Sequence, residues 1–400
     1  MTESILENAR CTIAVDARGA ITHIVNKRTG SDHIVPGAPP SWRLLTTRGS
    51  WTECPVNAAD NRGGVAVTGT EAVVRFDGLV AVQGDRLNIS LEFHFELGPD
   101  DDGVRAWYAI ENRTGETVGE VWFPLLAAVR DAGGDETTVI APVGVARRIR
   151  NPSKALPRQW LSMPAPPRAT RGVAYPGPGS MGWVDASTGD EGLYVASHAR
   201  DARRITMLLR GGAPGSFDVG FVTYPFVPSR QTYRSEPFEI CPHVGDWCAG
   251  AERYARFAAG WPVAGGGVPW LRETPGIRLA FMKHQTGRVY MRYSDLVAMH
   301  GDLRDRGLER VPLLVFGWFA GGHDAGCPDF QPDDELGGRD ELVRVLGEIR
   351  AAGGRIVLYA NGLLIDRAGA YFTCICATTG TTGTRRPARR TWRKKACCVP

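Results

Sequence analysis

Short apolar runs separated by glycine and proline turns fill the first 245 residues of the chain. Residues 12–15 and 21–25 are two β-rich runs around the turn 16–19, which is the pattern of a hairpin. Residues 87–95 alternate between apolar and polar side chains, as a half-buried antiparallel strand does. Because no helical period of useful length appears in this half, the pattern predicts a large β-sandwich over residues 1–245.

A helical period begins where the strand pattern ends. The segment 246–258 places apolar side chains on one helix face, and Asp246 stands where an N-cap is expected. Pro262 and the three glycines at 265–267 then interrupt the period. We therefore predict a helical linker with a hinge over residues 246–272.

After the linker, strands and helices alternate. The predicted elements are a strand at 277–282, a helix at 294–306 capped by Ser294, a strand at 311–316, a helix at 338–352 and a strand at 355–359. Short connections between such elements indicate parallel strands joined by right-handed crossovers. A (β/α) barrel and an open doubly wound sheet share this pattern, so periodicity alone does not choose between them.

Candidate binding residues follow the carboxyl ends of these strands, where parallel α/β folds bind their ligands. Lys283 follows the first strand and Asn361 follows the third. The glycine-rich loop after the second strand contains Trp318, His323 and Asp324. A sugar needs an apolar platform for its C–H face and carboxylates that accept from its hydroxyls, and Trp318 with Asp324 can supply both.

Structural roles are the alternative explanation for these candidate residues. Trp318 can cover the core, Asp324 and Asn361 can form turns, and His323 can be a structural side chain with satisfied hydrogen bonds. The acidic run 333–335 is expected on a solvated loop that leads to the next helix.

Motifs for other chemistries are absent from the sequence. It contains no serine nucleophile elbow, Walker loop, dinucleotide fingerprint or His-Glu-x-x-His motif. His323, Asp324, Cys327 and Asp329 do not have a zinc-ligand spacing. We therefore expect neither a cofactor nor a metal.

Composition and charge agree with a globular protein of two or three domains, since 43% of the 400 residues are hydrophobic and 22% are charged. Seven of the 47 basic residues, and none of the 43 acidic ones, lie between 372 and 400. The remainder is nearly neutral and offers no basic stripe for a nucleic acid, so no nucleic-acid partner is expected.

No stretch resembles a signal peptide or a membrane span, which predicts a cytoplasmic protein without a membrane partner. Five scattered cysteines are expected to be buried thiols: Cys11, Cys54, Cys241, Cys248 and Cys327.

Four stretches resemble bacterial glycosidase-like proteins catalogued as the domain of unknown function 6259 family, distant relatives of α-galactosidase and endo-α-N-acetylgalactosaminidase barrels. The stretches are the hairpin 11–26, residues 110–113 leading to 121–124, residues 245–247, and residues 316–329 followed by 336–338 and 359–361. The resemblance implies a multidomain β and α/β protein. A galactose-mutarotase-like β-sandwich is followed by a (β/α)8 TIM barrel, of which residues 273–371 are the first three βα units.

A carbohydrate partner also follows from the resemblance. Related retaining enzymes take their two catalytic carboxylates from the fourth and sixth barrel strands, and these have no counterpart here. Asp324 is then a substrate-binding carboxylate rather than a nucleophile.

The last residues differ in composition from everything before them. Residues 372–400 contain no acid, little aliphatic character, a run of arginine and lysine, and four of the nine cysteines. We interpret them as a disordered tail of the kind that DNA read out of frame produces, which makes the chain an incomplete barrel. Three functions stay open: a glycoside-hydrolase-like protein that lacks its catalytic residues, a non-catalytic carbohydrate-binding protein, and a truncated product without function.

Overall fold

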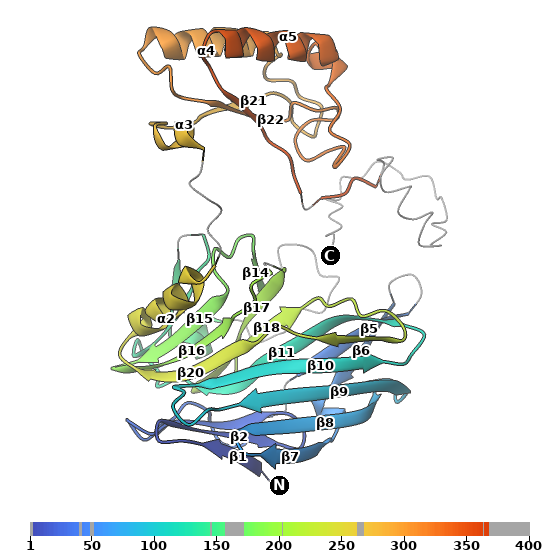
Figure 1. Cartoon of the computed structure of the whole chain (residues 1–400), viewed down its shortest axis with the longest axis vertical. Coiled ribbons are helices and arrows are strands. Elements are labelled where there is room, and N and C mark those ends of the chain that lie inside the picture. The colour runs from blue at the N-terminus through green and yellow to red at the C-terminus, as the bar shows by residue number, and fades with distance from the viewer. Residues whose placement is uncertain are drawn as a thin grey trace. The chain divides into compact units, whose positions relative to one another are not determined.

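The computed structural model describes residues 3–39, 42–48, 52–144, 146–156, 172–201, 203–261, 268–362 and 364–367. The chain divides after Trp261 into two compact units, which are described separately (Figure 1). The predicted hinge at 262–267 and the predicted tail at 372–400 lie outside the described residues.

The first unit consists of antiparallel sheets. The largest has the order β13 (Arg147–Arg150), β12 (Thr137–Ala141), β15 (Trp183–Thr188), β16 (Glu191–Ser197), β20 (Phe238–Val244), β10 (Val104–Asn112), β9 (Arg86–Glu96), β8 (Glu71–Val80), β7 (Gly64–Thr68), with β19 (Gln231–Arg234) also on β10. The second has the order β14 (Gly172–Tyr175), β17 (Ile205–Gly211), β18 (Ser216–Thr223), β11 (Thr117–Arg130), β5 (Arg43–Arg48), β6 (Thr52–Asn57). The smallest contains β1 (Glu3–Glu7), β2 (Cys11–Asp16), β3 (Ile21–Asn26) and β4 (Ser31–Asp32). The predicted β-rich half and its first hairpin are confirmed.

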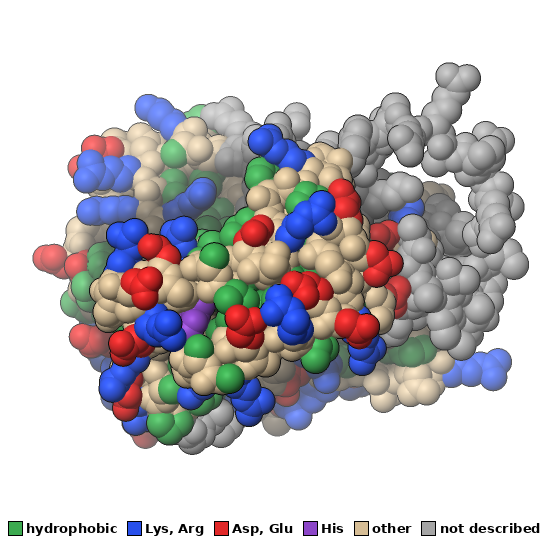
Figure 2. All heavy atoms as spheres, turned by 90° about the horizontal axis from the view of Figure 1, so that it is seen from above, with side chains coloured by type: hydrophobic (Ala, Val, Ile, Leu, Met, Phe, Trp, Pro, Cys, Tyr) green, Lys and Arg blue, Asp and Glu red, His purple; other side chains and the backbone are tan. Residues whose placement is uncertain are grey.

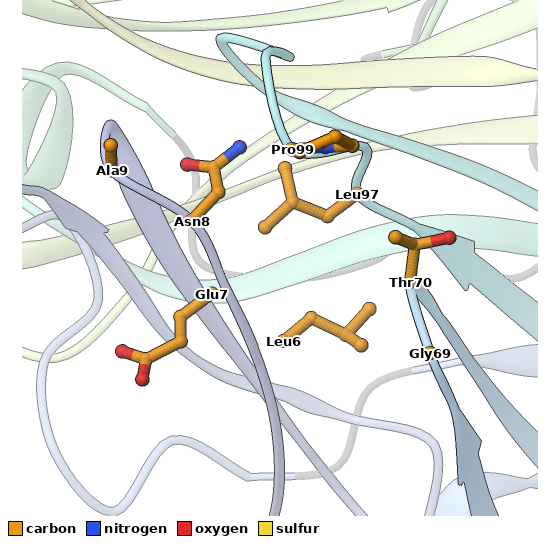
Figure 3. A pocket seen from close by; sticks show the side chains of 8 residues that line it. All are labelled: Leu6, Glu7, Asn8, Ala9, Gly69, Thr70, Leu97 and Pro99. Carbon is orange, nitrogen blue, oxygen red and sulfur yellow. The ribbon is translucent and has the colours of Figure 1, made fainter.

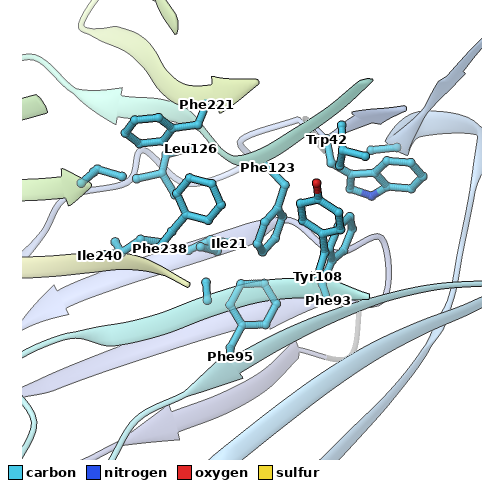
Figure 4. Close-up of a cluster of buried hydrophobic side chains, with 14 of the residues drawn as sticks. Ile21, Trp42, Phe93, Phe95, Tyr108, Phe123, Leu126, Phe221, Phe238 and Ile240 are labelled. Atoms are coloured by element: carbon cyan, nitrogen blue, oxygen red, sulfur yellow. The ribbon is translucent and has the colours of Figure 1, made fainter. Parts of the chain in front are cut away.

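Aromatic side chains from facing sheets fill the core between them (Figure 4). Phe93 on β9 stacks on Phe123 of β11, with ring centroids 4.5 Å apart and the ring planes 2° from parallel. The rings of Trp42 and Phe76 meet the ring of Phe93 edge-on, with centroids 5.5 and 5.8 Å away. Strand β9 alternates buried and partly exposed positions, as its sequence predicts, so its buried set reaches this cluster.

Helices in this unit are few: η1 (Ala58–Asp60), α1 (Pro152–Ala155) and α2 (Trp247–Ala259). The sequence predicted no helical period of useful length before residue 246, and α1 is a single turn of four residues. Pro152 at its first position supplies the fixed φ that starts such a turn.

The helix α2 belongs to the first compact unit, which ends at Trp261, within the segment 246–272 that was predicted as a linker. Tyr254 is buried, and its hydroxyl accepts a hydrogen bond from the Gly182 N–H at 3.3 Å. Arg253 donates through Nε to the Glu239 carboxylate of β20 at 2.6 Å. These contacts fasten the apolar face of the helix to the sheet, so the helix is part of the sandwich.

Thiol burial matches the expectation for three of the five cysteines. Cys11, Cys241 and Cys327 are buried, whereas Cys248 is exposed, and the side chain of Cys54 lies outside the described part. Burial raises the pKa of Cys11 to about 11 and that of Cys241 to about 12. Both thiols are therefore protonated and chemically inert near neutral pH.

The second unit contains α3 (Pro269–Arg272), β21 (Arg278–Phe281), α4 (Asp295–Asp305), β22 (Leu313–Phe316), η2 (Asp334–Leu336), α5 (Gly338–Ala351) and β23 (Ile356–Leu358). Its strands are parallel and have the order β21-β22-β23, as the sequence predicts. Consecutive parallel strands in this order occur in a barrel and in one half of a doubly wound sheet alike.

One face of this sheet packs on both long helices. Leu313 and Val315 of β22 are fully buried together with Leu296 of α4 and Val345 of α5.

On the outer surface of α5, Arg344 bridges Glu341 and Glu348, and Figure 2 shows acidic and basic side chains interspersed on the face in view. Among the described residues, no helix is long and apolar enough to cross a membrane.

The other face of the sheet is apolar and partly exposed. Leu279, Leu314 and Val357 stand in register across the three strands, and Leu279 and Val357 are 60% and 41% exposed. Phe281 and Phe316 form the next pair towards the carboxyl ends of the strands. Parallel sheets generally bury both faces, so an exposed apolar face is unusual for a parallel sheet.

The ring of Phe93 gives a stability prediction for the first unit. Phe93→Ala should lower the free energy of unfolding by about 3–5 kcal/mol, because it leaves a cavity in a fully buried aromatic cluster. Val82→Ala is the control, since the Val82 side chain is 52% exposed and its loss should change stability by less than about 0.5 kcal/mol. Guanidinium unfolding followed by tryptophan fluorescence measures both, and equal effects of the two changes would contradict the account of the core.

Candidate functional site

Three aromatic side chains end the three parallel strands on the open face of the sheet. The ring centroids of Phe281 and Phe316 are 6.4 Å apart, and those of Phe316 and Tyr359 are 4.7 Å apart. Tyr359 is held in this row because its N–H donates to the Val315 carbonyl at 2.9 Å. His323, from the loop after β22, packs against all three rings with centroid distances of 5.2, 5.6 and 5.1 Å. We call Phe281, Phe316 and Tyr359 the aromatic row.

The carboxylate of Asp324 lies beside this row. Its Oδ1 accepts a hydrogen bond from the Asn361 amide at 2.9 Å and from the Tyr359 hydroxyl at 3.3 Å. Its Oδ2 is 3.6 Å from Nε2 of His323. Burial, followed by the charge of Asp324, raises the pKa of Tyr359, which therefore stays a donor at neutral pH. The structure thus brings three sequence-predicted residues, His323, Asp324 and Asn361, into one cluster.

Backbone conformation explains why the loop after β22 is rich in glycine. Gly317 has φ +62°, and a Cβ there would lie 2.2 Å from the Lys283 carbonyl oxygen. The N–H of His323 donates to that same oxygen at 2.9 Å. Asp324 itself has φ +62°, a conformation that aspartate tolerates better than most residues. The loop after β22 therefore lies directly on the segment that follows β21. This contact places His323 and Asp324 of the loop at the open face of the sheet.

Trp318 occupies a core position. Its side chain packs within the cluster that joins the sheet to α4 and α5, and the residue is 9% exposed. Its indole N–H donates to the Tyr359 carbonyl at 2.8 Å, and its carbonyl accepts from the Tyr293 hydroxyl at 2.5 Å. This is the structural alternative that the sequence left open for Trp318. A role as a sugar platform would require an exposed indole face, and the packing of Trp318 in this cluster exposes little of its ring.

Lys283 points into an ion-pair network rather than into open solvent. Its ammonium lies 2.7 Å from the Asp333 carboxylate and 2.8 Å from that of Glu335. Burial lowers the pKa of Lys283, but the hydrogen bonds to the two carboxylates outweigh it, so that the pKa is raised. The contribution of this ion pair to stability is therefore present below pH 10.5 and is lost as the pH rises through the raised pKa.

Asp333 is buried, which corrects the prediction of a solvated position for this residue, whereas Asp334 and Glu335 are exposed as predicted. Its N–H donates to the Tyr293 hydroxyl at 2.8 Å, and its Oδ1 accepts from the Glu335 N–H at 2.9 Å. With Lys283 on the other oxygen, this carboxylate is fully engaged. Asp333 therefore fixes the segment between β22 and α5.

Sequence reasoning did not select the aromatic row or Asp333. A usable signal existed for the row, because Phe281, Phe316 and Tyr359 occupy equivalent places at the ends of the three predicted strands. No local signal existed for Asp333, because its partner Lys283 is 50 residues away in the chain. Among the described residues, no group of three or more His, Cys, Asp or Glu side chains is placed to hold a metal ion.

Comparisons with known proteins give a structural match without a sequence match. No family model and no curated protein matches the chain. The α-N-acetylgalactosaminidase NagBb from Bifidobacterium bifidum, in complex with GalNAc, matches with a TM-score of 0.60 and 14% identity, over 90% of this chain and 59% of that one. Its complex with Gal-NHAc-DNJ matches with a TM-score of 0.59 and 14% identity, over 90% and 58%. The chain has the fold of these structures.

The ligand-free form of the same enzyme matches with a TM-score of 0.55 and 13% identity, over 90% of this chain and 59% of that one. The chain therefore spans less than two thirds of the length of the structures it matches. At such low identity the likeness concerns the fold alone, which is that of a β-rich chain with more than one domain.

The ion pair of Lys283 gives the prediction for this part of the molecule. Lys283→Met should destabilise the second unit by about 3–5 kcal/mol, because it leaves the buried Asp333 carboxylate without its counter-charge. Hydrogen exchange in peptides that contain β21 and β22 reports this loss. Adding Asp333→Asn to Lys283→Met should restore much of the protection, since the amide oxygen can still accept from Glu335. A double variant no better than the single one would contradict the assignment.

Proposed function

We propose that this chain is a glycoside-hydrolase-like protein that binds a sugar at the carboxyl edge of the sheet β21-β22-β23. One observation carries the proposal: a carboxyl side chain, that of Asp324, stands beside a row of aromatic rings on a partly exposed face of the sheet. Sugars are recognised by this combination, because an aromatic face takes their C–H surface and a carboxylate accepts hydrogen bonds from their hydroxyls.

In this proposal each side chain has a separate task. Tyr359 and Asn361 donate to Oδ1 of Asp324, so they fix the plane of the carboxylate and leave Oδ2 for a hydroxyl group. The rings of the aromatic row are half-buried and would supply the apolar platform that Trp318 was expected to supply. His323 packs against the row and can donate or accept at the rim of the site. Lys283 binds the carboxylate of Asp333, which fixes the segment between β22 and α5.

The wider fold agrees with this proposal. We infer that the first unit is a galactose-mutarotase-like sandwich and that the second is the opening of a (β/α) barrel, in the domain of unknown function 6259 family. The fold of the α-N-acetylgalactosaminidase structures supports the inference, as does the apolar face of the sheet, which a barrel would turn towards its interior. Galactose and N-acetylgalactosamine are accordingly the first sugars to test.

Replacing Asp324 tests the site directly. A hydrogen bond to a charged group contributes about 1.5–3 kcal/mol, so Asp324→Asn should weaken sugar binding roughly ten- to a hundred-fold. Isothermal titration of the full chain with N-acetylgalactosamine and with galactose measures the change. The matched control is Asp334→Asn, an exposed carboxylate in the segment before α5, which should leave the affinity unchanged. Unchanged affinity in Asp324→Asn, with a folded variant, would contradict the site.

Turnover separates the proposed binding function from hydrolysis. The described residues of the second unit offer Asp324 but no second carboxylate on the aromatic row, so we expect binding without cleavage. The full chain incubated with p-nitrophenyl α-galactoside and its N-acetylgalactosaminide should release no more nitrophenol than buffer does. Release that is abolished by a substitution within residues 1–371 would contradict the proposal of a catalytically incomplete protein.

A further inference from the structure

The hairpin that follows β21 adds a cation to one end of the aromatic row. The N–H of Tyr290 donates to the Met282 carbonyl at 2.8 Å, and the Tyr290 ring meets the Phe281 ring edge-on with centroids 5.7 Å apart. The guanidinium carbon of Arg288 lies 4.9 Å from the centroid of the Tyr290 ring, in a cation–π contact. Arg288 is exposed and forms no ion pair with a carboxylate of the described residues. Tyr290 therefore holds an available positive charge beside the row.

The two ends of the row carry opposite charge. Residues 282–291 contain two basic residues and no acid, whereas the loop 317–330 contains two aspartates and no lysine or arginine. Asp324 is bound by Tyr359 at the end of β23, and the hairpin contacts Phe281 of β21. These strands are two positions apart in the sheet, so their backbones are separated by roughly 10 Å.

We propose that the site takes an oligosaccharide of at least two rings, with a neutral ring at Asp324 and an anionic group of the next ring at Arg288. The inference rests on the proposed sugar site. A pyranose ring is about as wide as one strand spacing, so a second ring is needed to reach from one end of the row to the other.

Charge determines which ring carries the anionic group. Such a group is disfavoured on the first ring, because like charges repel at Asp324. A guanidinium, in contrast, binds the oxygens of a carboxylate or a sulfate ester through paired N–H groups. Arg288 therefore selects for acidic glycans, and Asp324 fixes their orientation along the row.

A pocket in the first unit does not offer a comparable cation. It has a volume of about 280 Å³ and lies between the β1–β2 hairpin and the β7–β8 turn (Figure 3). The Glu7 carboxylate accepts a hydrogen bond from the Lys27 ammonium at 3.1 Å. The Asn8 amide donates to two backbone carbonyls and accepts from two backbone N–H groups. The exposed Thr70, which lines this pocket, is therefore a control position for binding elsewhere.

Three digalactosides test the proposal by isothermal titration of the full chain: one neutral, one with galacturonic acid as its second ring, and one with a sulfate ester on its second ring. At least one acidic ligand should bind about tenfold more tightly than the neutral one at low salt, and which one it is identifies the anionic group. This advantage should shrink as salt screens the charge. Arg288→Gln should remove the advantage and leave the affinity for the neutral ligand unchanged, which also shows that the variant is folded.

The controls are Arg278→Gln, an exposed arginine at the amino end of β21, and Thr70→Val, and both should leave all affinities unchanged. Asp324→Asn should weaken all ligands alike, because they share the neutral ring. Equal affinities for the three digalactosides, or a preference that survives in Arg288→Gln, would overturn this inference and leave the proposed function intact. So would binding of galactose without binding of any digalactoside. If neither these ligands nor galactose nor N-acetylgalactosamine binds, the proposed function fails and this inference fails with it.

Discussion

The candidate site depends on the register of three short parallel strands. Because side chains alternate between the faces of a strand, the register that buries Leu313 and Val315 against the helices also places Phe281, Phe316 and Tyr359 in one row on the opposite face. A shift by one residue would exchange the two faces and destroy both the core and the row. The burial that stabilises the second unit therefore also positions the aromatic row of the candidate site.

The loop that carries Asp324 is fixed by contacts on both of its flanks. On one side the loop contacts the Lys283 carbonyl, which leaves no room for a side chain at position 317 and accepts a hydrogen bond from the His323 N–H. On the other side Gly326 donates its N–H to the Asp366 carboxylate at 2.9 Å. The loop is thus held by the segments that follow β21 and β23. A preorganised carboxylate of this kind binds a ligand without a large cost in chain ordering.

Much of the architecture could be predicted because its signals are local. The three parallel strands appear as apolar runs at 277–282, 311–316 and 355–359, and the structure has them there with slightly shorter bounds. The capping role of Asp246 is also confirmed, since its side chain accepts from the N–H of Cys248 at 2.9 Å. Such features need only the chain's own neighbours, so periodicity and residue type are enough to find them.

A local alternative at one helix start, and features that depend on tertiary contacts, could not be found in this way. Ser294 was predicted to cap α4, but its side chain makes no cap hydrogen bond, and Asp295 accepts from the Arg292 N–H instead. For Trp318 the sequence left both a sugar platform and a core position open, and only the structure shows that its side chain packs in the core, with its indole N–H donating to the Tyr359 carbonyl. Of the predicted site, His323, Asp324 and Asn361 meet as a cluster because they follow adjacent strands, which the sequence does indicate. Their sugar-binding role stays a prediction.

Hydrogen exchange of the full chain, with and without saturating N-acetylgalactosamine or galactose, tests the central claim most directly. The account predicts that the sugar slows exchange in peptides that cover residues 317–330 and 359–362, because ligand contacts would stabilise the loop and the strand end that hold Asp324. It predicts no comparable change in the sheets of the first unit. Protection confined to the first unit, or protection nowhere at concentrations at which binding is saturated, would contradict the placement of the site.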